Sequence, residues 1–180
     1  MITNRWPEMT TASQQRRLFF ALWPDAATRA ALAQTQSGLT GAVIRAEKLH
    51  LTMAFLGQRP VGALAALCQV MAALPAQPLM LQLDRYGYFA SQRIAWAGMQ
   101  SVPPALLELR CDLMRLLAAH LLVPAFEEER FVPHVTLARK AEPAAATGFA
   151  PIFWHATQMV LAAPSMATHG YQIFAARSLA

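Results

Sequence analysis

Two segments of the chain repeat one pattern of reactive side chains. A histidine, a threonine two residues later, and then an apolar residue and an alanine occur as His50-Leu-Thr52-Met-Ala54 and as His134-Val-Thr136-Leu-Ala138. In a β-strand, side chains at i and i+2 project from the same face. Each segment therefore predicts a strand that displays an imidazole and a hydroxyl side by side.

The residues between these polar positions are apolar, which predicts that the opposite face of each strand is buried. The predicted back faces are Leu49, Leu51, Met53 and Phe55 in the first segment and Phe131, Pro133, Val135 and Leu137 in the second. A third copy, His155-Ala-Thr157, continues with Gln158 where the other two have an apolar residue. We interpret His155 as a strand residue without a catalytic role.

Two histidines that face one cleft suit a reaction that needs one base and one acid. An imidazole pKa near 6.5 allows one ring to be neutral and the other protonated close to neutral pH. In phosphodiester cleavage the neutral ring takes a proton from water and the imidazolium protonates the departing sugar oxygen. Thr52 and Thr136 can donate hydroxyl hydrogen bonds to the phosphate oxygens. The residues alone do not say which of His50 and His134 is the acid.

Arg139, three residues after Thr136, has two interpretations. Its fork-shaped, permanently charged guanidinium could bind the same phosphate. Strict strand alternation, however, places Arg139 on the face opposite His134 unless the strand ends or twists there, and it would then be a surface residue.

The motifs of other catalytic sites are missing from the sequence. Neither histidine segment has a second metal ligand at i+2 or i+4, so we expect no metal. The sequence has no glycine-rich phosphate loop and no nucleophile elbow for Ser/His/Asp hydrolysis. We expect no cofactor.

Composition predicts a folded protein and is compatible with an anionic ligand. With 180 residues, 56% hydrophobic and 14% charged, the chain suits one compact unit or two intimately packed lobes. Its net charge of +5 fits an anionic ligand. Residues 1–15 contain no apolar signal segment and are expected to form a flexible tail before a single domain over 16–180. Cys68 and Cys111 are expected to be buried, reduced thiols of a cytoplasmic protein.

Apolar periodicity and turn residues divide the chain into strands and helices. The uncharged stretch 61–74 is too short to span a bilayer and predicts a core helix, so we expect no membrane partner. Other helices are predicted from an Asp25 N-cap to about Ser37 and after Pro104. Strands are predicted at 17–23, 49–57, 79–88, 93–99, 152–162 and 171–177 and around His134. This order predicts an α+β chain with antiparallel pairing, in which the two histidine strands belong to two similar lobes.

Four longer motifs carry a resemblance to a known family. The chain resembles the two-histidine (2H) phosphoesterases, and among them the bacterial RNA 2′,3′-cyclic phosphodiesterases, also called the 2′-5′ RNA ligase or LigT-like family. The motifs occur in the family's order, at Arg17–Asp25, Leu49–Gly57, Arg93–Gly98 and Phe131–Arg139.

The resemblance implies a bilobal, pseudo-twofold fold in which two antiparallel sheets line a central cleft and the helices lie outside. It implies metal-independent hydrolysis of an RNA terminal 2′,3′-cyclic phosphate to a 2′-phosphomonoester, with His50 as proton donor and His134 as proton acceptor. It also implies reversible 2′-5′ joining of RNA halves. The expected partner is RNA with a cyclic phosphate end, including tRNA fragments, and no obligate protein partner is expected.

Two alternatives and several residue roles stay open at this point. The same site could act on a small cyclic nucleotide such as an ADP-ribose cyclic phosphate, or the cleft could bind RNA ends without catalysis. Arg93 and His169 are further candidates for an RNA groove. Base stacking is expected from an aromatic residue, with Phe19, Phe55, Phe89 and Tyr171 as the candidates.

Overall fold

The structure is a computed structural model, and it describes residues 15–122, 131–165, 167 and 170–180. The strands are β1 (Gln15–Leu22), β2 (Ala42–Val43), β3 (Leu51–Pro60), β4 (Leu79–Phe89), β5 (Ile94–Gly98), β6 (His134–Arg139), β7 (Gly148–Ala156), β8 (Gln158–Pro164) and β9 (Tyr171–Ser178). The helices are α1 (Ala26–Gln34), α2 (Leu64–Ala73) and α3 (Pro104–Ala119), with short 3-10 turns η2 (Ala46–Lys48) and η3 (Val61–Ala63).

The described strands form an antiparallel sheet in the order β7-β4-β5-β6-β3-β1-β8-β9, with β2 paired to β6. The sheet consists of two halves, β7-β4-β5-β6 and β3-β1-β8-β9. A single residue pair between β3 and β6, Leu51 opposite Val135, connects them. The predicted α+β class is confirmed, and the two expected sheets are continuous through this one pair.

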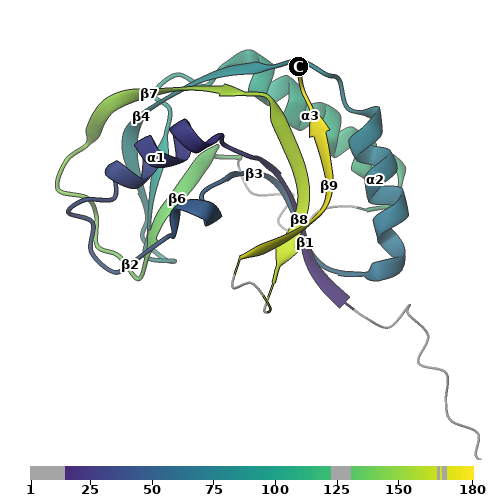
Figure 1. The fold of residues 1–180 in the computed structure, drawn as a ribbon, viewed down its shortest axis with the longest axis horizontal. Helices are drawn as coiled ribbons and strands as arrows, with labels where there is room; N and C mark the ends of the chain where they lie inside the picture. The colour runs from purple at the N-terminus through teal and green to yellow at the C-terminus, as the bar shows by residue number, and fades with distance from the viewer. Residues whose placement is uncertain (1–14, 123–130, 166, 168–169) are drawn as a thin grey trace, which may run out of the picture.

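Each half of the sheet has its own helices. Helix α1 packs against β7, whereas α2 packs against β8, β9 and α3, and α3 packs against β3. Figure 1 shows α1 on the side of β4, β6 and β7, and α2 and α3 on the side of β1, β8 and β9. Helix α1 begins at the predicted N-cap, since the Asp25 carboxylate accepts a hydrogen bond of 2.7 Å from the Thr28 N–H. No helix in the described residues is long and apolar enough to cross a membrane.

The main core lies behind the two histidine strands. Leu51 of β3 and Val135 of β6 are fully buried in it, and so are Leu113 and Leu117 of α3. The predicted buried back faces are therefore confirmed at Leu51 and Val135. They hold β3 and β6 against the helices and leave His50, Thr52, His134 and Thr136 on the other face.

The expectations for the segment 152–162 and for the cysteines are wrong. The segment 152–162 is not one strand, because β7 ends at Ala156 and β8 starts at Gln158. The break at Thr157 marks the point where the chain leaves the β4 edge of one half and joins β1 and β9 of the other. Cys111 is exposed rather than buried, because it lies on the outer side of α3, and Cys68 is half-buried.

Candidate active site

The register of the central strand pair brings the two motifs together. Leu51 and Val135, which pair across β3 and β6, each directly follow a motif histidine. An antiparallel register centred on this pair sets His50 across from Thr136 and Thr52 across from His134. Because Leu51 and Val135 point into the core, all four polar side chains lie on the opposite face of the sheet.

The two imidazoles make the same backbone contact. His50 Nδ1 lies 2.7 Å from the carbonyl oxygen of Lys48, and His134 Nδ1 lies 2.7 Å from that of Val132. A carbonyl only accepts, so Nδ1 is the protonated nitrogen of each neutral ring and Nε2 has the lone pair. Each histidine is thus fixed as one tautomer by the residue two positions before it.

Aromatic rings surround both histidines but in different geometries. The His50 ring is stacked on Phe19 (centroids 4.9 Å apart) and on Trp23 (5.7 Å), and the edge of Tyr171 meets it at 5.1 Å. The His134 ring instead meets Phe89 edge to face at 4.9 Å and lies 5.7 Å from the tilted ring of Trp96. These contacts limit ring rotation and remove much of the water around each imidazole.

Burial lowers the pKa of both imidazoles. The pKa of His50 falls from 6.5 to about 4, mainly because burial disfavours the imidazolium, and the positive charges of His134 and Arg139 lower it further. The pKa of His134 is also lowered, first by burial and then by Arg139, while the hydrogen bond to Val132 opposes this shift. Both rings are therefore neutral at pH 7 in the ligand-free protein.

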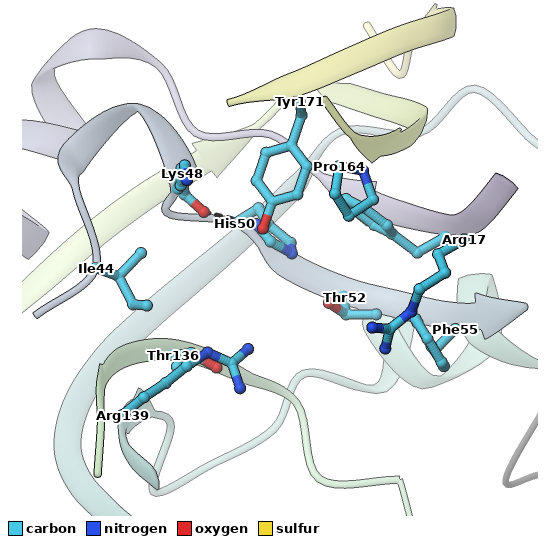
Figure 2. A pocket seen from close by; sticks show the side chains of 11 residues that line it. Arg17, Ile44, Lys48, His50, Thr52, Phe55, Thr136, Arg139, Pro164 and Tyr171 are labelled. Carbon is cyan, nitrogen blue, oxygen red and sulfur yellow. Dashed lines mark hydrogen bonds between the residues drawn. The ribbon is translucent and has the colours of Figure 1, made fainter. Parts of the chain in front are cut away.

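A cavity of about 420 Å³ lies over this part of the sheet. Its lining includes His50, Thr52, Thr136 and Arg139, which come from both halves, and Figure 2 shows their side chains converging with the Tyr171 hydroxyl close to His50. His134 is not among the lining residues. The positive charge of His134 nevertheless lowers the pKa of His50.

A bulge in β6 brings Arg139 to this cavity. Ala138 pairs with Ala95, and Thr136 pairs with the next residue, Trp96, so Leu137 is an extra residue in the register. One extra residue reverses the alternation of side chains beyond it. Arg139 is therefore on the Thr136 face, and of its two interpretations the structure supports a place at the site.

A similar irregularity in β3 turns Phe55 toward the cavity. Phe20 pairs with Ala54, and the next residue, Ala21, pairs with Thr52, which leaves Met53 as the extra residue. Phe55 consequently lines the cavity with Thr52, and Ala54 belongs to the main core. The prediction that Phe55 shares the buried face of Leu51 is wrong for this reason.

The other candidates divide between the site and the rest of the surface. Phe19 and Tyr171 line the cavity with Phe55, whereas Phe89 packs against His134 outside it. Arg93 is exposed, forms an ion pair with Glu142 and does not line the cavity. His155 lines separate cavities beside α1. His169 lies outside the described residues.

Sequence reasoning missed Arg17 and Lys48 as lining residues. Alternation along β1 from Phe19, which faces the cavity, points to Arg17 two residues earlier. Lys48 precedes β3 and carried no comparable signal. The lining includes three cations, Arg17, Lys48 and Arg139, and no carboxylate. In the described part of the chain, no three His, Cys, Asp or Glu side chains gather as a metal site would require.

Known proteins of similar sequence support the family assignment. Over 137 residues the chain is 32% identical to the RNA 2′,3′-cyclic phosphodiesterase of Escherichia coli K12. This alignment covers 73% of this chain and 76% of the relative. Over 102 residues it is 39% identical to the enzyme of the same name from Geobacillus stearothermophilus. That alignment covers 54% of this chain but only 32% of the relative, so the chain spans about a third of its length.

Solved structures agree over nearly the whole chain. Escherichia coli LigT in its apo form matches with a TM-score of 0.78, and its complex with 3′-AMP matches with 0.77. Both are 27% identical in sequence, and each match covers 92% of this chain and 98% of LigT. The family model of the 2′-5′ RNA ligase superfamily matches residues 22–169. This match spans most of the chain and confirms the resemblance seen in the motifs: the chain belongs to the 2′-5′ RNA ligase superfamily.

Proposed function

We propose that this protein hydrolyses the 2′,3′-cyclic phosphate at the end of an RNA to a 2′-phosphomonoester. The observation that carries the proposal is the pair of histidines, each held as one tautomer by the backbone carbonyl two residues before it and set across from the other motif's threonine. The activity named for the Escherichia coli and Geobacillus relatives also supports it. Each imidazole can accept or release a proton at Nε2, as general base and general acid catalysis require.

His134 is the general base and His50 the general acid in this proposal. The Nε2 lone pair of His134 takes a proton from water as the water oxygen attacks phosphorus. The bond from phosphorus to the 3′ oxygen breaks, and the protonated Nε2 of His50 gives its proton to that oxygen. The phosphate thus stays on the 2′ oxygen. The family resemblance supports this division of roles between the two rings.

Donors around the cavity bind the phosphoryl oxygens. Thr52 and Thr136 supply hydroxyl groups and Arg139 supplies a planar guanidinium, which suits an anion whose charge grows in the transition state. The proton transfers are assigned to imidazoles, so the proposed reaction uses no metal and no cofactor. Joining of RNA ends would use the same groups, with a 5′-hydroxyl in the place of water.

The test is product analysis on an RNA that ends in a 2′,3′-cyclic phosphate, with a chelator present, at about pH 5 to 8 where imidazoles titrate. We expect a 2′-phosphomonoester as the product. The absence of this product at every pH would contradict the proposal. Binding of the RNA end without turnover would instead support a non-catalytic binding module.

A further inference from the structure

The cavity extends beyond the four polar residues of the two motifs. Arg17 of β1 and Phe55 of β3 line the same space as Thr52. A volume of about 420 Å³ lies in the range of small-molecule sites and exceeds what a cyclic phosphate alone would fill. The part of the cavity near Arg17 is therefore available to a further portion of the substrate.

Arg17 is held in place by an aromatic ring rather than by an acid. Its guanidinium carbon lies 5.3 Å from the centroid of the Phe55 ring. Within the described residues, no acidic side chain forms an ion pair with Arg17. The side chain is exposed, so its N–H donors are accessible to a ligand.

Two guanidinium groups reach the cavity from different strands. Figure 2 shows Arg139, from β6, and Arg17, from β1, pointing into the space between them from different sides. The bulge at Met53 makes this arrangement possible, because it turns Phe55 to the cavity face, where Phe55 pairs across from Phe19 and lies beside Arg17. The bulge thus provides the stacking surface, while the position of Arg17 itself follows from the alternation along β1 from Phe19.

We propose that Arg17 binds a second phosphate of the substrate, the 5′-phosphate of the nucleotide that ends in the cyclic phosphate. This inference rests on the proposed function and specifies its substrate class. A planar guanidinium with several N–H donors recognises phosphate well, and stacking on Phe55 orients it at little entropic cost. The site then prefers an RNA end, which has this phosphate, over a nucleoside cyclic phosphate, which lacks it.

The test compares two substrates that differ by one group, uridine 2′,3′-cyclic phosphate and the same molecule with a 5′-phosphate. For the wild-type protein we expect kcat/KM to be about tenfold higher with the 5′-phosphate, the factor that one charge-assisted contact supplies. In Arg17→Gln this ratio should fall to about one. Arg16→Gln removes the same charge from the neighbouring position, which does not line the cavity, and should keep the wild-type ratio.

A wild-type ratio near one, an unchanged ratio in Arg17→Gln, or an equal loss in Arg16→Gln would overturn the inference. A binding experiment separates this result from a failure of the proposed hydrolysis. By calorimetry, uridine 2′,5′-bisphosphate should bind the wild-type protein more tightly than uridine 2′-monophosphate, and Arg17→Gln should abolish this difference. Equal affinities of the wild-type protein for both would contradict the role of Arg17 even if no turnover occurs.

Discussion

At the scale of single residues, the proposed mechanism couples protonation to substrate binding. The pKa of His50 lies at about 4 because its ring is buried among aromatic side chains and near two positive groups. An imidazolium there is unfavourable until an anion enters the cavity. The phosphate of the substrate is such an anion, and a nearby negative charge raises the pKa of a histidine. In the proposed mechanism, His50 then gains its proton when the group that it protonates arrives.

The lowered pKa values predict the pH dependence of the free enzyme. In the proposed mechanism the active form has one proton on the histidine pair, and both pKa values lie below 6.5, that of His50 at about 4. Above this range the singly protonated form becomes rare, so kcat/KM should fall about tenfold for each pH unit between about pH 7 and 8. Its maximum should lie between about 4 and 6.5. Steady-state kinetics with a short RNA would check this, and a flat profile above pH 7 would contradict it.

At the scale of strands, two bulges decide which residues share the cavity. Met53 in β3 and Leu137 in β6 are extra residues, and each reverses the faces of the residues that directly follow it. Phe55 and Arg139 reach the cavity for this reason. In the half-sheet that contains His134, the Trp96 ring packs closely against Gly87 and Gly98 and also lies beside the His134 ring.

Gly87 of β4 makes room for the Trp96 ring. A Cβ at Gly87 would lie 2.0 Å from that ring, which itself lies 5.7 Å from His134. Gly87→Ala should therefore displace Trp96, lower the free energy of unfolding by about 1–3 kcal/mol, and lower kcat by disturbing His134. Urea unfolding and turnover assays measure both effects.

Gly62 offers a matched control, because a Cβ there meets nothing within 4 Å. Gly62→Ala should leave both stability and turnover close to the wild-type values. If Gly87→Ala behaved in the same way, the packing of Trp96 would not be important for His134.

Sequence patterns predicted most of the helices and strands but not the bulges. Local periodicity and turn residues predict the helices that begin after Asp25 and at Pro104 and the hairpin of β4 and β5. They also predict that His50 and Thr52 lie on the same face. Met53 and Leu137 are apolar, as a regular buried face requires, so nothing local marks them as extra residues. The bulges depend on pairing with β1 and β5, which are distant in the chain, and the register of Leu51 with Val135 is likewise a tertiary property.

At the scale of the whole molecule, the site exists because two half-sheets meet at one residue pair. Each half contributes one histidine, one threonine and one arginine at the cavity or beside it. The net charge of +5 and the three cations of the lining favour an anionic substrate throughout its approach. Recognition of RNA should accordingly depend on salt.

This charge distribution predicts a measurable salt effect. If Arg139 and Arg17 each contact one phosphate, the affinity for a short RNA that ends in a 2′-phosphate should fall about sevenfold between about 50 and 200 mM salt, from a slope near 0.7 per phosphate on single strands. Fluorescence anisotropy would measure it. Arg17→Gln should show about half of this slope in a logarithmic plot, and a slope equal to that of the wild-type protein would argue against the second contact.

We propose that the two opposed histidines, and not His155 of the third His-x-Thr copy, perform the reaction. The direct measurement follows an RNA 2′,3′-cyclic phosphate by ³¹P NMR with the wild-type protein, His50→Gln, His134→Gln and His155→Gln, each checked for folding by circular dichroism. We expect the 2′-phosphomonoester from the wild-type protein and from His155→Gln at equal rates. His50→Gln and His134→Gln should each be slower by about 10²–10⁴-fold. A folded His50→Gln or His134→Gln protein that keeps the wild-type rate would contradict a catalytic role for that histidine.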